Sequence, residues 1–265
     1  MSRTMEGIAR HQVGETEVFC LTDGLLDLGP DVFPEVAPAR REAAHPGGVR
    51  IEANVHLLRH GDGALDLVDT GCGPLIYGGA GGRLPALLAS LGIAPDRIGR
   101  IIFTHLHGDH AAGALDAGGR PVFPAAKILM HEKELAFWQG REDTAGGRLI
   151  AACGDRIETV RDGDDLGHGL RVWFLPGHTP GHIGLRLGAG FALIGDLVHS
   201  VQLQIGDPTV HTRYDTDSAQ GDATRQAAFE TIAEEGLVIS GGHLMWAEKF
   251  LRLERDGAGF RSVAP

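Results

Sequence analysis

The sequence predicts an α/β sandwich in which two β-sheets lie inside and helices cover them outside. Three observations favour this fold class. Strand patterns occur in both halves of the 265-residue chain, helical patterns lie between them, and the strands near 170–196 are joined by Gly and Pro turns, as in an antiparallel meander. No linker or short-period repeat divides the chain, so we expect one domain over residues 1–265.

The first half alternates strands with one clear helix. Leu84, Leu87, Leu88 and Leu91 are spaced at i, i+3, i+4 and i+7, which predicts a helix over 83–92 with one apolar face. Apolar or alternating stretches predict strands at 15–23, 49–59, 64–71 and 98–105.

The segment 24–48 interrupts this pattern. Pro30, Pro34, Pro38, Pro46 and Gly47 predict a long irregular loop, and a loop of that length is either disordered or functional. We expect it to form a pocket wall or a dimer contact, and the sequence does not separate the two.

The second half contains more strands and two helices. A strand at 127–131 precedes a helix at 132–139, and a longer helix at 218–235 has Ser218 or Asp217 as its expected N-cap. Further strands are predicted at 170–178, 182–188, 191–196 and 237–243.

Composition and charge exclude several classes of protein. The formal net charge is −11 and no Lys/Arg run is present, which argues against nucleic acid or an anionic membrane as a partner. Cys20, Cys72 and Cys153 form no disulfide framework, and neither a signal peptide nor a membrane-spanning stretch is evident. We therefore expect a cytoplasmic protein whose partner is neither nucleic acid nor a membrane.

A cluster of metal-ligand side chains follows the apolar strand at 98–105. The stretch FTHLHGDHAAG (103–113) contains His105, His107, Asp109 and His110. Neutral imidazole and carboxylate are ordinary ligands for zinc and its neighbours. One ion needs about three protein ligands and two ions need about six, so four residues predict further ligands downstream.

Three later segments supply such residues at strand ends. His178 lies in LPGHTPGH (175–182), Asp196 ends LIGD (193–196), and His243 ends SGGH (240–243). Sheets behind the strand ends would hold these side chains rigidly. His182 follows His178 by four residues in the same motif.

Together these motifs resemble the metallo-β-lactamase superfamily of binuclear metallohydrolases. The matching motifs are HLHGDH (105–110), the earlier LVDTG (67–71), PGHTPGH (176–182), GD (195–196) and GGH (241–243), in order over roughly residues 49–250. The resemblance implies an α+β fold of the αβ/βα four-layer type, with two central mixed sheets and helices outside, and a site at one edge between the sheets.

The resemblance also implies roles for individual residues. His105, His107 and His178 would bind the first metal, and Asp109, His110 and His243 the second, with Asp196 bridging the two. Asp69 of VDTG would hydrogen-bond around the metal site and orient a ligand. The expected cofactors are two divalent ions, with Zn²⁺ first and Mn²⁺, Fe²⁺ or Co²⁺ as alternatives.

Two such ions would make the chain a hydrolase. Their charge lowers the pKa of a bridging water far below ~15.7, and the resulting hydroxide attacks a carbonyl carbon or a phosphorus. Asp109 and Asp196 are the expected catalytic carboxylates, and Asp109 would carry a proton to the leaving group. The expected substrate is a lactone, an ester or a phosphotriester.

The C-terminal half resembles the methyl parathion hydrolase branch, which lies near the N-acyl-homoserine lactonases. The resemblance rests on residues 195–230 and on the closing stretch 242–265. Trp138 falls where that branch has an aromatic residue beside the substrate pocket. His199, three residues after Asp196, stands where many homoserine lactonases carry a tyrosine. Both residues are expected to line the pocket, and a homodimer is one expected assembly.

Alternative functions on the same scaffold stay open. A glyoxalase II-like thioesterase would need basic residues for a glutathione-like anion, and no clear set is present. An iron-dependent oxidoreductase would have a glutamate in place of His107 or would leave the second metal position unfilled. A non-catalytic binding protein would have lost ligands.

Other polar residues are expected to have no role in the site. His131 should be exposed at a helix start, and Asp207 and Asp215 should be solvated. The remaining isolated histidines are expected to be structural or on the surface: His11, His45, His56, His60, His168 and His211.

Overall fold

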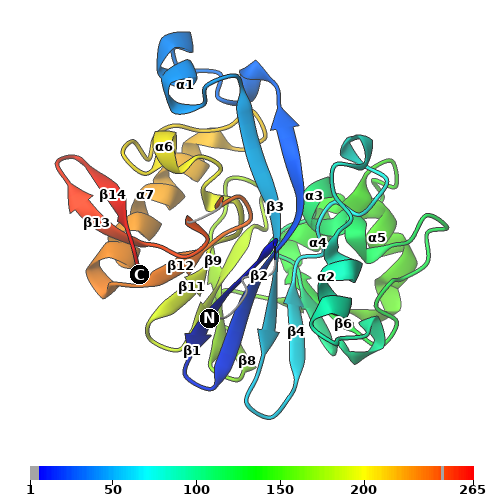
Figure 1. Cartoon of the computed structure of the whole chain (residues 1–265). Helices are drawn as coiled ribbons and strands as arrows, with labels where there is room; N and C mark the ends of the chain where they lie inside the picture. The colour runs from blue at the N-terminus through cyan, green and yellow to red at the C-terminus, as the bar shows by residue number, and fades with distance from the viewer. Residues whose placement is uncertain (1–5, 246–247) are drawn as a thin grey trace.

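The computed structural model describes residues 6–245 and 248–265, so Trp246 and Ala247 of the closing stretch lie outside it. It confirms the predicted α+β fold: two mixed sheets face each other, and helices cover their outer faces (Figure 1). The first sheet follows chain order, antiparallel from β1 to β4 and parallel from β4 to β7. Its strands are β1 (Ile8–Val13), β2 (Thr16–Leu28), β3 (Val49–Arg59), β4 (Leu65–Val68), β5 (Arg100–Ile102), β6 (Lys127–His131) and β7 (Ile157–Val160).

The second sheet has the order β12-β11-β10-β9-β8. β11 and β12 are parallel, and the other neighbours are antiparallel. A hairpin of β13 (Arg252–Asp256) and β14 (Gly259–Val263) lies beside it. The strands of the sheet are β8 (Asp165–Gly167), β9 (Leu170–Phe174), β10 (Ile183–Leu187), β11 (Phe191–Leu193) and β12 (Val238–Ser240).

The helices form the two outer layers. Figure 1 shows α2, α3, α4 and α5 gathered beside the first sheet, with α7 beside the second sheet and the hairpin. The helices are α1 (Pro38–Ala44), α2 (Leu84–Ser90), α3 (Gly108–Ala111), α4 (Glu132–Trp138), α5 (Ala145–Cys153), α6 (Val201–Gln204) and α7 (Ser218–Glu235).

Alternating strand residues build three apolar layers. On β3, Leu57 faces the helices while Leu58 faces the other sheet, and Ile101 and Ile102 on β5 divide in the same way. Strand side chains alternate between faces, so each strand of the first sheet serves two layers. The layer between the sheets contains Val18, Leu58, Val68, Ile102, Leu129, Val172, Leu185 and Leu193.

The expectation of an irregular loop at 24–48 is wrong in part. β2 continues to Leu28 and pairs with the start of β3, and α1 lies within the segment. Pro38 occupies the first turn of α1, where the missing N–H costs nothing because that turn leaves its N–H groups unpaired. Leu26, Val32, Phe33, Ile51, Leu203 and Val210 form a separate apolar cluster here, which we call the roof cluster.

Several short elements were not predicted. β1, β7, β8 and the β13–β14 hairpin lie at sheet edges or expose many side chains, so their hydrophobic pattern is weak. Helices α1, α3, α5 and α6 were also missed. The predicted strands at 98–105, 170–178, 191–196 and 237–243 end earlier than expected, because the chain leaves the sheet before each polar cluster.

His131 was expected to be exposed, and this is wrong. It is 4% exposed and stacks on Phe174, with ring centroids 4.4 Å apart. Its Nδ1 accepts a hydrogen bond from the Lys133 backbone N–H at 3.1 Å and so caps α4. A helix start that faces the second sheet is buried, and the local sequence does not report that packing.

Within the part of the chain that the structure describes, no helix combines the length and apolar character needed to cross a bilayer.

The cap of α7 gives a test of local stability. Asp217 is the N-cap, and its carboxylate accepts a hydrogen bond from the Gln220 backbone N–H at 3.0 Å. Asp217→Ala should lower the free energy of unfolding by about 1 kcal/mol in urea denaturation. Ser218→Ala is the matched control, because Ser218 lies inside the helix; a larger loss there than at Asp217 would contradict the assigned cap.

Candidate metal centre

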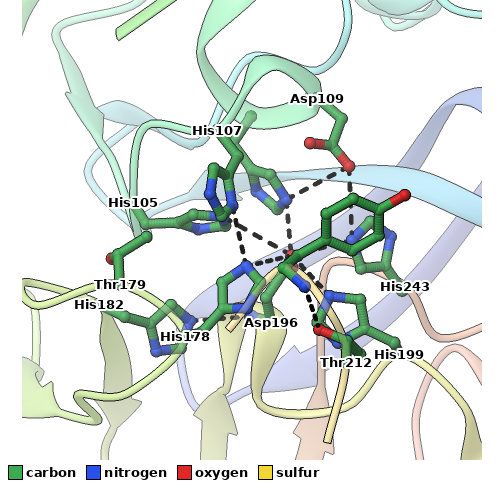
Figure 2. A network of polar contacts seen from close by, with 12 residues as sticks. His105, His107, Asp109, His178, Thr179, His182, Asp196, His199, Thr212 and His243 are labelled. Carbon is green, nitrogen blue, oxygen red and sulfur yellow. Dashed lines mark hydrogen bonds and ion pairs between the residues drawn. The ribbon is translucent and has the colours of Figure 1, made fainter. Parts of the chain in front are cut away.

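The seven expected ligands meet at one edge between the two sheets, and Figure 2 labels all of them except His110. The first sheet supplies four of them, because His105 and His107 follow β5 while Asp109 and His110 lie in α3. The second sheet supplies the others: His178 follows β9, Asp196 follows β11, and His243 follows β12. Both sheets therefore present polar side chains from the ends of buried strands.

Three imidazoles form the first group. His107 Nδ1 lies 3.1 Å from His105 Nε2 and 3.0 Å from His178 Nε2. Asp196 Oδ2 lies 3.6 Å from His105 Nε2 and 3.4 Å from His178 Nε2. Three nitrogens and one carboxylate oxygen thus face a common point.

A carboxylate and two imidazoles form the second group. Asp109 Oδ2 lies 3.8 Å from His110 Nε2 and 3.5 Å from His243 Nε2. Asp196 Oδ1 lies 3.1 Å from His110 Nε2, and its Oδ2 lies 3.0 Å from His243 Nε2. Asp196 therefore faces both groups.

The residues fit metal ions. Within residues 6–245 and 248–265, His110 Nε2 and Asp196 Oδ1 are buried without a hydrogen-bond partner. Buried polar atoms normally have a partner, and a divalent cation between the two would satisfy both. Imidazole nitrogens with carboxylate oxygens suit zinc and neighbouring transition metals.

Hydrogen bonds outside the cluster orient the rings. His178 Nδ1 donates to Asp215 Oδ1 at 2.7 Å, and His243 Nδ1 donates to the Glu52 carbonyl oxygen at 2.8 Å. These partners accept only, so each Nδ1 carries a proton, and each Nε2 can offer a lone pair to a metal ion once its own proton is lost. Asp215 was expected to be solvated, and this is wrong: its side chain is buried against His178.

Asp69 orients the histidine ligands that follow the first sheet. Its Oδ2 accepts from His110 Nδ1 at 2.9 Å, and its two oxygens accept from the N–H and the hydroxyl of Thr104, each at 2.8 Å. The Thr104 hydroxyl then accepts from His105 Nδ1 at 3.1 Å. Asp69 has a φ of 64°, a strained conformation for a residue with a side chain, of a kind that clusters at functional sites.

His182 does not face the centre with a free nitrogen. Its Nδ1 donates to the Leu175 carbonyl oxygen at 2.8 Å, and its Nε2 accepts from the Asp196 backbone N–H at 2.9 Å. It therefore holds the turn that carries Asp196. Gly195 in that turn has a φ of 50°, and a Cβ there would lie 2.5 Å from His182 Nε2, so only glycine fits.

The electrostatics of the cluster favour added positive charge. Burial acts to raise the pKa of Asp196, but the imidazoles of His110 and His243 hold it well below its usual range. Burial acts to lower the pKa of His178, but Asp196 and Asp215 raise it to about 9. Burial lowers the pKa of His107 to about 3. Protons and metal ions therefore compete for the same nitrogens, and metal uptake releases protons.

A pocket opens above the cluster. Leu28, Ile51, Tyr77 and Tyr214 form its apolar wall. Leu28 lies in the segment 24–48, for which a pocket wall was one expectation, and the other three were not expected from the sequence. Among the described residues, no lysine or arginine lines this pocket. The wall comes from strand ends and loops far apart in the chain, which gives no local sequence signal.

The two expected pocket residues differ in position. His199 lines the pocket, with Nε2 3.3 Å from Asp196 Oδ2, and burial lowers its pKa to about 4. Trp138 is 8% exposed and lies behind His107, with ring centroids 5.5 Å apart. Its Nε1 donates to Glu134 Oε1 at 2.6 Å, so its polar atom faces α4 and away from the pocket. Trp138 is not among the lining residues.

Known proteins share this fold and these motifs. A family model described as the metallo-beta-lactamase superfamily matches residues 49–243. The N-acyl homoserine lactonase AiiB of Agrobacterium fabrum (strain C58 / ATCC 33970) is 24% identical over 246 residues, which cover 80% of this chain and 86% of that protein.

Solved structures resemble nearly the whole chain. AidC, described as a dizinc quorum-quenching lactonase, superposes with a TM-score of 0.89 at 22% identity, covering 98% of this chain and 97% of its own. The hydrolase AbOPH, of the beta lactamase superfamily, gives a TM-score of 0.87 at 26% identity, covering 99% of each chain. With the family match spanning most of the sequence and the ligand cluster assembled, the chain belongs to the metallo-β-lactamase superfamily and is a metal-dependent hydrolase.

Proposed function

We propose that this protein hydrolyses small neutral lactones, with N-acyl homoserine lactones as the first candidates, and that it uses two divalent metal ions, Zn²⁺ first. The observation that carries the proposal is Asp196, which faces both ligand groups at the base of a pocket with an apolar wall. The lactonase names of AiiB and AidC support the choice of substrate.

The ligand groups assign residues to each ion. His105, His107, His178 and Asp196 would hold one, and Asp109, His110, His243 and Asp196 the other. When bound, such ions supply a hydroxide nucleophile at neutral pH and a Lewis acid for a carbonyl oxygen.

Two side chains of the pocket would act on the substrate. Asp109 lines the pocket, and its carboxylate would pass the hydroxyl proton of the tetrahedral adduct to the leaving alkoxide oxygen as the C–O bond breaks. His199 stays neutral at pH 7, because its pKa is about 4, and it would contact the bound substrate from its place in the pocket lining beside Asp196.

The wall of the pocket favours a neutral substrate over the alternatives. A glutathione thioester carries carboxylates that need cationic partners, and among the described residues no lysine or arginine lines the pocket. Both ligand groups are complete, and His107 provides an imidazole where an iron-dependent oxidoreductase would have a carboxylate.

A substrate panel tests this choice. The panel contains homoserine lactones of several acyl lengths, an aryl ester, a phosphotriester and a glutathione thioester. We expect the highest kcat/KM for a lactone and the lowest for the thioester, because only the thioester brings uncompensated charge into the pocket. A thioester preference would overturn the proposal in favour of the glyoxalase II-like alternative.

Removal of metal should abolish the reaction. Dialysis against a strong chelator is expected to eliminate lactone hydrolysis, and addition of Zn²⁺, Mn²⁺ or Co²⁺ should restore it, with about two ions per chain at full activity. Activity that survives in protein shown to be metal-free would contradict the proposed mechanism.

A further inference from the structure

A buried carboxylate outside the ligand set lies beneath the first ligand group. Glu134 in α4 has 0% of its surface exposed, and burial raises its pKa. Among the residues that the structure describes, it has no Lys, Arg or His ion-pair partner. A buried carboxylate is costly unless hydrogen bonds compensate it, so its partners show what it does.

Both carboxylate oxygens of Glu134 are saturated with donors. Oε1 accepts from the Leu106 backbone N–H at 2.9 Å and from Trp138 Nε1 at 2.6 Å. Oε2 accepts from the Thr179 hydroxyl at 2.6 Å and from the Gly181 backbone N–H at 3.1 Å.

Three of these four donors belong to the loops that carry the first ligand group, and the fourth, Trp138, lies in α4 itself. Leu106 lies between His105 and His107, in the loop after β5 of the first sheet, whereas Thr179 follows His178 in the loop after β9 of the second. One side chain thus joins the two loops that supply all three imidazoles of that group. Asp109, His110 and His243 of the second group are bonded to other partners.

Close packing leaves the joined loops little freedom. A Cβ on Gly181 would lie 2.2 Å from the Glu134 backbone nitrogen, so this loop lies directly against α4. Trp138, one turn after Glu134, packs edge-on against the ring of His107. The separation of His107 and His178, 3.0 Å between ring nitrogens, therefore depends on contacts with α4.

We propose that Glu134 is a positioning residue for the first ligand group, which fixes the spacing of His105, His107 and His178 by tying a loop of one sheet to a loop of the other. The inference rests on the proposed two-metal function. Loss of the Glu134 hydrogen bonds lowers the affinity of the first ligand group for its ion. Outer partners of metal ligands typically contribute 10- to 100-fold to metal affinity.

Glu134→Gln tests the proposal with little change in size. The amide keeps one acceptor oxygen and places an NH₂ group against two donors. Zinc-loaded protein is dialysed against chelators of graded strength, and retained zinc is measured by mass spectrometry. We expect the variant to lose one of its two ions to a chelator whose affinity for zinc is about 10- to 100-fold lower than that of the chelator needed for wild type. The second ion should be retained as in wild type.

Asp23→Asn is the matched control. Asp23 is also 0% exposed, and it accepts from the backbone N–H groups of Cys72, Gly82 and Leu84, whose loop carries no metal ligand. We expect it to lower the thermal midpoint of unfolding but to leave the zinc-retention curve unchanged. Should Glu134→Gln fail to fold, Thr179→Val removes one donor, and a smaller selective loss of one ion decides the question.

The outcomes are distinguishable. A Glu134 variant that unfolds earlier yet keeps both ions at wild-type affinity would overturn the proposal, since Glu134 would then serve only stability. The proposal would also be overturned if the Asp23 variant lost both ions as readily as the Glu134 variant, because reduced stability of the whole fold would then be the cause. Wild-type protein that binds fewer than two zinc ions would instead overturn the proposed function.

Discussion

Replacement of Asp196 by Asn is expected to abolish hydrolysis while the chain stays folded. The Asp196 carboxylate lies within 3.0–3.6 Å of ring nitrogens from both ligand groups and from His199. Asn has nearly the same shape but no charge and only one oxygen, so the two groups can no longer share a carboxylate. The loss in kcat/KM should exceed the ~100-fold typical of outer partners of ligands, because the shared ligand itself is altered.

The measurement combines kcat/KM for the best lactone, metal content and far-UV circular dichroism. Asp207→Asn is the control: Asp207 bonds Arg40 and Thr209 and does not line the pocket, so near-normal activity is expected. His105→Ala should match the loss seen for Asp196→Asn. A variant at position 196 that hydrolyses lactones at close to the wild-type rate would contradict the two-metal assignment.

Replacement of Asp215 by Asn should have the second-largest effect. The Asp215 carboxylate accepts from His178 Nδ1 and lies 3.7 Å from Nη2 of the buried Arg225. Its pKa is held below the usual range mainly by the hydrogen bond to His178, which opposes burial. The neutral amide loses the charge-assisted bond that makes the His178 ring a better ligand, and we expect metal affinity to fall about 10- to 100-fold.

Metal titration of chelated protein measures this change, and kcat/KM at saturating metal separates weaker binding from slower chemistry. Asp222→Asn is the control, because Asp222 also pairs with Arg225 but does not contact His178. An equal loss of affinity in the two variants would show that the loop around Arg225, and not the bond to His178, is responsible.

Residues next to the ends of apolar strands could be anticipated from the sequence. His105, His178, Asp196 and His243 each follow a short apolar run that the structure shows to be a buried strand. The matching motif order gave the family and the fold, both confirmed by the structure and the comparisons. Strand periodicity and strand-end chemistry are local properties, so one sequence can report them.

The partners of the ligands could not be anticipated. Asp215 lies 37 residues from His178, and Glu134 lies 45 residues from Thr179. Each is a single acidic residue in a polar or amphipathic stretch, and its role exists only once two sheets have packed. Three residues of the pocket wall, Ile51, Tyr77 and Tyr214, were missed for the same reason, whereas Leu28 lies in the segment 24–48 that was expected to form a pocket wall or a dimer contact.

The roof cluster lies around the segment 24–48, which was predicted wrongly for a different reason. The prolines of 24–48 were interpreted as loop residues, yet Pro38 starts a helix and the preceding strand runs on to Leu28. Proline has a fixed φ and lacks a backbone N–H, and both properties suit the first turn of a helix as well as a loop. What decides between them here is burial of Val32 and Phe33 against Leu203 and Val210, far along the chain.

The division of ligands between the sheets has a mechanical consequence. Four of the seven ligands follow a strand of the first sheet and three follow strands of the second. The thickness of the apolar layer between the sheets, which contains Val18, Leu58 and Leu185, therefore sets the distance between the two sets of ligands. A substitution that adds one methylene to this layer, far from the reacting atoms, would move the two sets of ligands apart. We therefore expect substitutions in this layer to change kcat although these residues do not contact the substrate, and the change should grow with the separation of the two sheets.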